Sequence, residues 1–435
     1  MSLSQGMRQL AGTLPAGLMG IQGAPQKVET ENESMLITRR SLNRRDFLKR
    51  LAALLGFGLG GGFNVLLPRA FGHVGNPSGL DALQHLAYDD LKVFTDWLGR
   101  EGVQGYIGEL NWPNDQQRGF GDEAQWNTLG EKWYQWADAS KLWVTMWCVD
   151  EYQRWGGFWL TTYVSVGDGQ TRPISRPLAQ APVYEAHPST ADYRRGINLS
   201  GAERWEEGIN SNSKLGTYGV DYWYASQESM DYLASRGTKI IRLPFRWERI
   251  QPTLGGALNT FELTQLKNCV ARAAKAGLRV ILDLHNYAGY HLSMKKNTSR
   301  EYKLGSSRLP ASYLYDVWRR LSDNFKSDSA VVSYSIMNEP VNIPAAGYAS
   351  PQKAWESYSQ DVVTNIRNIG DDKLIMVPGY HWSMARLWAY HHPRRWISDS
   401  ANNYLYEAHH YFDEGSGHYN RSYDDAVAYW RSQGY

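Results

Sequence analysis

Short apolar runs alternate with segments of helical periodicity along residues 80–435, and this alternation constrains the fold more than any other feature of the chain. Buried parallel strands are short apolar runs, and the helices between them complete βα units. The runs predicted to be strands are 105–110, 142–148, 195–200, 239–245, 279–285, 331–338, 373–378 and 403–411. The segments predicted to be helices are 83–98, 122–139, 223–236, 259–276, 310–326, 351–369 and 422–433. Eight strands close a barrel, so we expect one α/β domain, a (β/α)8 TIM barrel, over residues 75–435.

One segment, residues 165–192, interrupts the alternation. Gly, Pro, Gln and Ser dominate it and no periodicity is visible, which predicts a loop or linker. Two predicted strands precede it, in residues 75–164, and six follow it, in residues 193–435. Since neither part closes a barrel alone, we expect the linker to join two parts of a single barrel.

Residues 1–74 are predicted to lie outside the fold. Residues 43–49 read Asn-Arg-Arg-Asp-Phe-Leu-Lys, and a Gly-rich apolar run follows at 51–67. Paired arginines before a weakly hydrophobic stretch are typical of a twin-arginine export signal. The apolar run is short and rich in glycine, so it is a poor membrane span. We predict a secreted or periplasmic protein without stable membrane insertion; the alternative is an amphipathic surface helix.

Charge and cysteine content exclude several classes of function. The net charge of +2 gives no reason to expect nucleic acid or an anionic membrane as a partner. The only cysteines, Cys148 and Cys269, lie in apolar segments and are expected to be buried thiols. The chain has no HExxH motif, no GxSxG motif and no Gly-rich loop after a strand. We therefore expect no metal and no cofactor, and we expect a monomer.

Aromatic residues are unusually abundant, with 18 Trp and 28 Tyr. The flat C–H faces of sugar rings stack on aromatic faces, so this excess favours a carbohydrate-binding protein over one in which aromatic residues only fill a large core.

Chemically useful side chains stand at the ends of the predicted strands. They are Glu109, Trp147, Arg242, His285, Asn338, Glu339, His409 and Tyr411. Barrel active sites lie at the C-terminal ends of the strands, so these side chains are expected to meet at one face. Taken singly, each is more commonly structural; it is the set that indicates a site.

Two carboxylates in that set meet the requirement for cleaving a glycosidic bond. One must be protonated to donate to the leaving oxygen, and the other must stay ionised. Arg242 and Tyr411 are expected to hold Glu109 ionised. Asn338 is expected to bind the sugar 2-hydroxyl, and Trp147 to form a floor under the sugar. His285 and His409 are expected to bind substrate hydroxyls or to hold the acid network.

These residues stand in motifs that resemble glycoside hydrolase family 5, especially its cellulase-like members. The motifs are Gly-Tyr-Ile-Gly-Glu at 105–109, Thr-Met-Trp at 145–147, Ile-Arg-Leu-Pro-Phe-Arg-Trp-Glu-Arg at 241–249, Leu-Asp-Leu-His-Asn-Tyr at 282–287, Ile-Met-Asn-Glu-Pro at 336–340 and Tyr-Glu-Ala-His-His-Tyr-Phe-Asp at 406–413. The resemblance implies a retaining mechanism with Glu339 as acid/base and Glu109 as nucleophile. It also implies that the other six residues of the set line the subsite where cleavage occurs.

The order of the motifs departs from the family pattern. In the family the strand that carries the nucleophile is the seventh, whereas here it comes first, at residue 105. The resemblance therefore implies a circular permutation in which strands 7 and 8 precede strands 1 to 6. The alternatives are a truncated chain with an unrelated segment at 80–160, or an error in the assembly of the sequence.

The resulting hypothesis is a retaining endo-β-1,4-glucanase acting on a β-glucan. One alternative is the same mechanism on mannan, xyloglucan or β-1,3-glucan, or as an exo-glucosidase. A more distant alternative is a non-catalytic carbohydrate-binding barrel, which would lack one of the two carboxylates.

Overall fold

The computed structural model describes residues 81–114, 118–150, 160–165, 173–204, 211–293, 299–413 and 417–433. The predicted export signal within residues 1–74 lies outside this part of the chain. No helix among the described residues combines the length and the apolar character that crossing a membrane requires.

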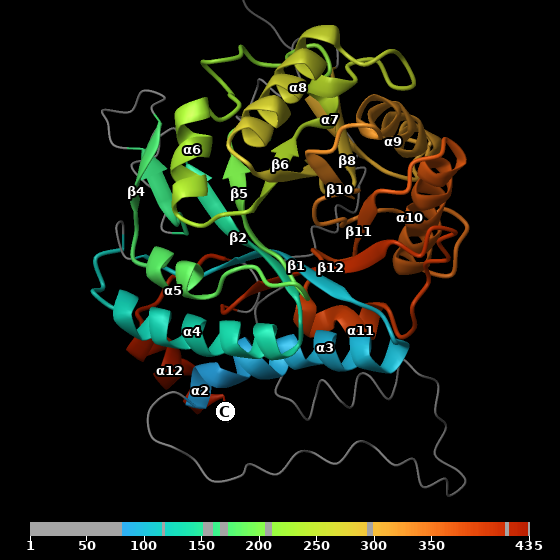
Figure 1. The fold of residues 1–435 in the computed structure, drawn as a ribbon. Coiled ribbons are helices and arrows are strands. Elements are labelled where there is room, and N and C mark those ends of the chain that lie inside the picture. Colours follow the sequence, from blue (N-terminus) through green and yellow to red (C-terminus); the bar gives the residue numbers. More distant parts are fainter. Residues whose placement is uncertain are drawn as a thin grey trace, which may run out of the picture. The chain divides into compact units, whose positions relative to one another are not determined.

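Eight parallel strands form a closed ring at the centre of the molecule (Figure 1). They are β1 (Gly105–Asn111), β2 (Trp143–Asp150), β5 (Arg195–Ser200), β6 (Ile240–Phe245), β7 (Arg279–Leu284), β10 (Val331–Ser335), β11 (Leu374–Pro378) and β12 (Tyr404–Tyr411). The strands follow one another in chain order, and β12 pairs with β1 to close the ring. The predicted (β/α)8 barrel is therefore confirmed.

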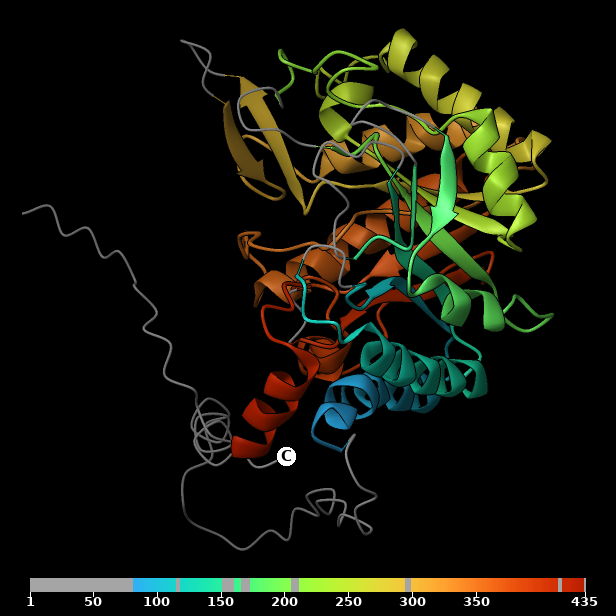
Figure 2. The same cartoon turned by 90° about the vertical axis from the view of Figure 1, so that its left-hand side faces the viewer.

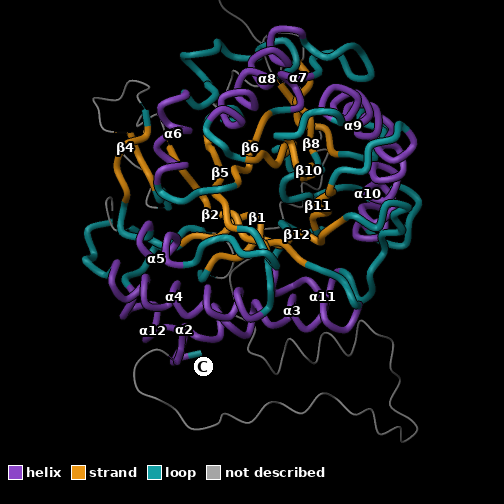
Figure 3. Tube along the Cα trace, viewed as in Figure 1, coloured by secondary structure: helices purple, strands orange, loops and turns teal. Residues whose placement is uncertain are grey.

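Helices surround the ring on its outside, as the purple layer around the orange strands in Figure 3 shows. The longer ones are α3 (Asp90–Glu101), α4 (Glu123–Ala139), α6 (Gln227–Ser235), α8 (Thr260–Lys275), α9 (Ser312–Phe325), α10 (Pro351–Asn368) and α12 (Tyr423–Ser432). Each turns an apolar stripe inward; α9, for example, buries Leu314, Val317, Trp318 and Leu321 at helical spacing. The side chains of Ser226, Asn259, Ser350 and Ser422 accept backbone N–H groups at the starts of α6, α8, α10 and α12.

Two groups of buried side chains hold the barrel together. Tyr106, Ile240, Ile281, Met376 and Leu405 form one cluster inside the ring of strands. The larger cluster fills the space between strands and helices. Because strand side chains alternate between the two faces, β1, β6, β7, β11 and β12 each supply residues to both clusters. The two cysteines are buried free thiols, as predicted.

The predicted linker contains more structure than its composition indicates. Strand β3 (Tyr163–Ser165) pairs in parallel with the end of β2, and β4 (Ile174–Pro177) pairs antiparallel with β3. Helix α5 (Ala181–Ala186) follows. The hairpin of β8 (Gly289–Ser293) and β9 (Ser299–Lys303) was likewise not predicted; it projects from the barrel at the upper left of Figure 2. Both ribbons depend on pairing between strands, which local periodicity does not record.

The two ends of the described chain lie side by side. The first helix, α2 (Asp81–Gln84), packs against α12, and both figures place the two together below the barrel (Figures 1 and 2). Between them the chain passes once round the barrel.

Candidate active site

A bulge in β1 directs Glu109 to the inside of the barrel. The register of β1 with β12 shifts between Ile107 and Glu109, and Glu109 then pairs with His409. Tyr106 faces the interior and Ile107 the outer core, so regular alternation would turn Glu109 outward. The extra residue, Gly108, restores the inward direction.

Only glycine fits at the bulge. A Cβ at Gly108 would lie 2.2 Å from Oε1 of Glu407 and 2.8 Å from Nε2 of His409. The carbonyl of Gly108 accepts hydrogen bonds from Thr145 Oγ1 at 2.7 Å and Asn198 Nδ2 at 2.9 Å, which hold the bulged backbone in place.

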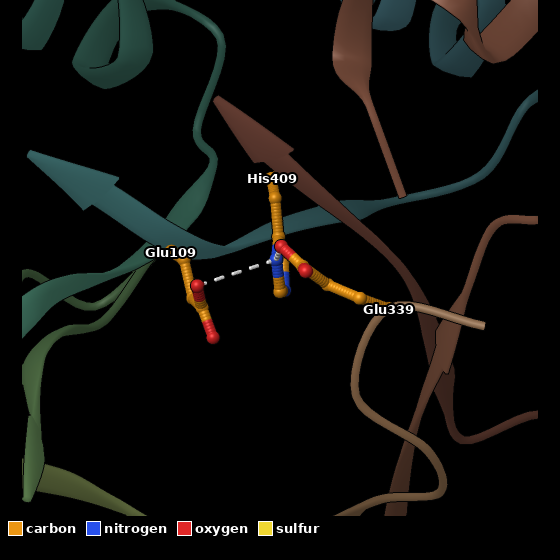
Figure 4. A group of neighbouring side chains, drawn as sticks. All are labelled: Glu109, Glu339 and His409. Carbon is orange, nitrogen blue, oxygen red and sulfur yellow. Dashed lines mark hydrogen bonds and ion pairs between the residues drawn. The ribbon is translucent and has the colours of Figure 1, made fainter. Parts of the chain in front are cut away.

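The structure brings together the two carboxylates that the sequence analysis singled out. Glu109, Glu339 and His409 each offer one ligand atom, and these three atoms all lie within 4.8 Å of one another. In Figure 4, Glu109 and Glu339 approach from different segments, and the ring of His409 lies between them. Glu339 stands beyond the end of β10 with a left-handed φ of 44°, a backbone conformation that residues other than glycine adopt mainly under local constraint.

Glu109 is almost fully buried and is held by two donors. Arg242 Nη1 donates to its Oε1 at 3.2 Å, and the hydroxyl of Tyr411 donates to its Oε2 at 2.9 Å. Burial raises the pKa of Glu109, and the charge of Glu339 raises it further, whereas His409 and Arg242 oppose the rise. Glu109 therefore retains a proton more readily than an exposed carboxyl would.

His409 is a cation within this pair. Its Nδ1 lies 2.8 Å from Glu339 Oε1 and 3.6 Å from Glu109 Oε2, and its Nε2 lies 3.4 Å from Glu407 Oε1. Burial by itself lowers the pKa of His409, but these carboxylates raise it to about 10. The imidazolium thus donates to the pair of Glu109 and Glu339 from one nitrogen and to Glu407 from the other.

Arg242 lies beneath the pair and is fully buried among acceptors. Besides Glu109, its guanidinium contacts Asp283 at 3.0 Å and Glu407 at 3.1 Å. It also donates to the side-chain oxygens of Asn198 at 3.0 Å and Asn338 at 2.8 Å. A buried guanidinium with this many partners fixes the positions of all of them.

Asp283 and Glu407 are members of the site that the sequence analysis quoted within motifs but did not single out. Both accept a hydrogen bond from the hydroxyl of Ser335. Burial raises the pKa of Asp283 to about 7, while Arg242 and His409 overcome burial and lower the pKa of Glu407. The signal was present in the sequence, because Asp283 precedes His285 by two positions and Glu407 precedes His409 by two, which places each pair on one face of a strand.

His285 and Asn338 form a second, neutral part of the site. His285 Nδ1 lies 2.8 Å from Asp283 Oδ2, and its Nε2 accepts from Asn338 Nδ2 at 3.2 Å and from the Tyr287 hydroxyl at 3.1 Å. Burial lowers the pKa of His285 to about 3, so the ring is neutral. Asn338 therefore has its amide oriented by Arg242 on one side and His285 on the other.

Two tryptophans stand beside the polar residues. Trp147, on β2, is half-buried and stacks on His285, with ring centroids 5.7 Å apart. Trp382, which the sequence analysis did not single out, is 36% exposed and meets Tyr287 edge-on at 5.9 Å. The positive φ values of His381, Trp382 and Ser383 form a left-handed turn, and such strained backbone is concentrated at functional sites.

Glu109, Glu339 and His409 are also the only group among the described residues whose donor atoms lie close enough to hold a metal ion. The ring of His409 carries a proton on each nitrogen, so a cation would have to displace one of them. The absence of a catalytic metal stays a prediction.

The chain is similar to one protein family and to several known proteins. The family model described as cellulase, glycosyl hydrolase family 5, matches residues 196–435. The manganese dependent endoglucanase Eg5A of Phanerodontia chrysosporium is 29% identical over 160 residues, which are 36% of this chain and 36% of that protein. The probable endo-beta-1,4-glucanase B of Neosartorya fischeri is 28% identical over 226 residues, 51% of this chain and 61% of that protein. The matched stretches thus cover 36% and 61% of the lengths of these two relatives, less than two thirds of either.

A solved structure, an endo-beta-1,4-glucanase of Xanthomonas axonopodis pv. citri, is 35% identical; the match covers 55% of this chain and 73% of that one, with a TM-score of 0.44. Residues 81–165, which carry Glu109 and Trp147, lie outside the stretch that the family model matches.

Proposed function

Because this chain belongs to the cellulase family, glycosyl hydrolase family 5, we propose that it hydrolyses internal β-1,4 bonds of a β-glucan with retention of anomeric configuration. The observation that carries the proposal is the approach of Glu109 and Glu339, whose nearest oxygens lie within 4.8 Å. Retaining enzymes hold their two carboxyl groups about 5–5.5 Å apart, whereas inverting enzymes leave room for a water between them.

In the first step Glu339 donates its proton to the glycosidic oxygen while an oxygen of Glu109 attacks the anomeric carbon. The bond between the anomeric carbon and the leaving sugar breaks, and an ester to Glu109 forms. This step requires Glu109 to be ionised, and the hydrogen bonds from Arg242 and Tyr411 stabilise that form.

In the second step Glu339, now a carboxylate, removes a proton from a water molecule that attacks the anomeric carbon. The ester bond breaks and Glu109 leaves as a carboxylate, which Arg242, Tyr411 and the imidazolium of His409 stabilise. Two inversions at the same carbon give net retention.

The surrounding residues would orient the sugar. Asn338, which Arg242 and His285 hold in one orientation, would bind the 2-hydroxyl. Trp147 would form the floor of the subsite where cleavage occurs. The exposed Trp382 would provide a second stacking surface, beside Tyr287.

Product analysis on a panel of polysaccharides tests this proposal. We expect reducing ends and short oligosaccharides from a β-1,4-glucan, with β-anomers as the first products in NMR spectra. Preferential cleavage of mannan, xyloglucan or β-1,3-glucan would show that the substrate is a different polysaccharide, and the proposed mechanism would still hold. First products that are α-anomers would exclude the retaining mechanism, and binding without cleavage would indicate a carbohydrate-binding barrel.

We further propose that the chain is a circular permutation of the family barrel. The family match begins within β5 and includes six of the eight strands of the ring, while β1 and β2, which complete the ring, precede it. The adjacent positions of α2 and α12 support the proposal, because a chain can be opened where its ends are neighbours. A variant with residues 81–190 moved behind residue 433 should fold and keep its activity, whereas deletion of 81–164 should abolish both. An active deletion variant would show that the N-terminal segment is an accessory.

Export by a twin-arginine signal in residues 1–74 is also a proposal, and it fits an enzyme that acts on an external polymer. Replacing Arg44 and Arg45 by Lys should keep the protein in the cytoplasm of a host that has this pathway, as fractionation and immunoblotting would show.

A further inference from the structure

A row of contacting aromatic rings leads from the catalytic residues to the surface. The ring of His285 meets Tyr287 with centroids 5.3 Å apart, and Tyr287 meets Trp382 at 5.9 Å. Exposure rises along this row, from a buried histidine to a tryptophan that is 36% exposed.

A second group of contacting rings begins at His381, the residue that precedes Trp382 in the chain. The ring centroids of His381 and His391 are 4.7 Å apart, and those of His391 and Tyr390 are 5.0 Å apart. Tyr390 lies in the short helix α11 (Trp388–His391) and is 56% exposed. The backbone N–H of His381 donates to the carbonyl of Pro340 at 2.9 Å, so this second group is anchored directly beside Glu339.

The two histidines present neutral rings. Burial, with the charge of Arg386 adding to it, lowers the pKa of His381, and burial lowers the pKa of His391 to about 4. Gln352 Nε2 donates to His391 Nδ1 at 2.9 Å, so the proton of this ring is on Nε2. Among the described residues Nε2 has no hydrogen-bond partner, which leaves this N–H, together with the hydroxyl of Tyr390, to bind a ligand.

Neutral rings with donors at their edges suit a neutral sugar polymer, which offers C–H faces and hydroxyls but no charge. We propose that Tyr390, His391 and His381 form a saccharide-binding surface outside the catalytic site, which holds the part of a β-glucan chain that extends beyond Trp382. The inference rests on the proposed function for the identity of the polymer. The proposed surface gives a role to aromatic residues that lie outside the catalytic site.

Affinity electrophoresis in gels that contain soluble neutral β-glucans tests the surface without requiring turnover. All proteins carry Glu109→Gln, so the polysaccharide stays intact. Tyr390→Ala should raise the dissociation constant about tenfold, since loss of one stacked ring removes roughly 1.4 kcal/mol. Tyr390→Phe, which keeps the ring, should bind nearly as tightly as the parent. Phe261→Ala is the matched control, because Phe261 is 53% exposed and lies outside the row.

Kinetics with Glu109 intact give a second measurement. The ratio of kcat/KM on a long β-glucan to kcat/KM on an aryl cellobioside should fall in Tyr390→Ala and not in Phe261→Ala. If β-glucan retards Tyr390→Ala as strongly as the parent protein, the proposed binding surface is wrong. It is also wrong if no neutral β-glucan retards the parent protein. If the native protein hydrolyses no β-glucan, the proposed function is wrong instead. The retardation of Tyr390→Ala would then still show whether Tyr390 belongs to a saccharide-binding surface.

Discussion

The Nδ1 of His409 lies 2.8 Å from Oε1 of Glu339. The same nitrogen lies 3.6 Å from Oε2 of Glu109, so one buried imidazolium connects the two carboxylates on which the proposed chemistry depends. A cation in this position reduces the repulsion between two acids that must work within 5 Å of each other. Four predictions concern this arrangement.

Replacing Glu109 by Ala should reduce turnover by several orders of magnitude, because no covalent intermediate can form without the nucleophile. Azide, which fits the space left by the carboxylate, should restore turnover and give an α-glycosyl azide, which NMR spectroscopy identifies. Full activity in the variant would end the assignment of Glu109 as nucleophile.

Replacing Glu339 by Gln should affect substrates according to their leaving groups. A positioned general acid contributes about 10²–10⁴-fold, so kcat/KM on polysaccharide should fall by about that factor. For an aryl cellobioside with an acidic phenol the fall should be much smaller, because that leaving group needs no proton. Initial rates on both substrates measure the difference. Equal losses would contradict the role of Glu339 as acid.

His409 should make folding stability depend on pH at high pH. Its pKa rises from 6.5 in the unfolded chain to about 10 in the folded protein. The native state therefore binds more protons between these values, and the stabilisation is complete below pH 6.5 and is lost as the pH rises through 10. Urea unfolding from pH 6 to 10 should show that the stability difference between the native protein and His409→Asn shrinks as the pH rises.

The matched control for this titration is His381→Asn, because the pKa of His381 is lowered, not raised, so above about pH 8 this residue is neutral in both the folded and the unfolded chain. A stability difference for His409→Asn that stays constant from pH 6 to 10 would show that His409 is not charged in the folded protein.

Replacing Gly108 by Ala should damage both stability and catalysis. The new Cβ would overlap Glu407 and His409, and overpacking of this kind costs about 1–3 kcal/mol. Displacement of His409 and Glu109 by even about 1 Å should lower kcat by roughly 10²-fold. Gly99→Ala, in α3, is the control; its Cβ would meet no atom within 4 Å, so denaturant unfolding should show no loss of stability. Normal kcat in Gly108→Ala would mean that the bulge does not position Glu109.

The sequence by itself determined the barrel, because buried parallel strands and amphipathic helices have different periods, and both periods are readable along the chain. It also located the strand ends, and so it singled out Glu109, Glu339, Arg242 and His409 before any geometry was known. The family membership that its motifs implied is confirmed, while the catalytic roles remain predictions.

Only the tertiary structure decided how those groups act on one another. Local pattern could not show that a bulge at Gly108 turns Glu109 inward, because the bulge exists only relative to the register of β12. It could not show that Asp283 and Glu407 share Arg242, or that three carboxylates keep His409 charged, since burial and contacts between different strands set those energies. The ribbon of β3 and β4 was hidden as well, because it depends on pairing between two strands, which local periodicity does not record.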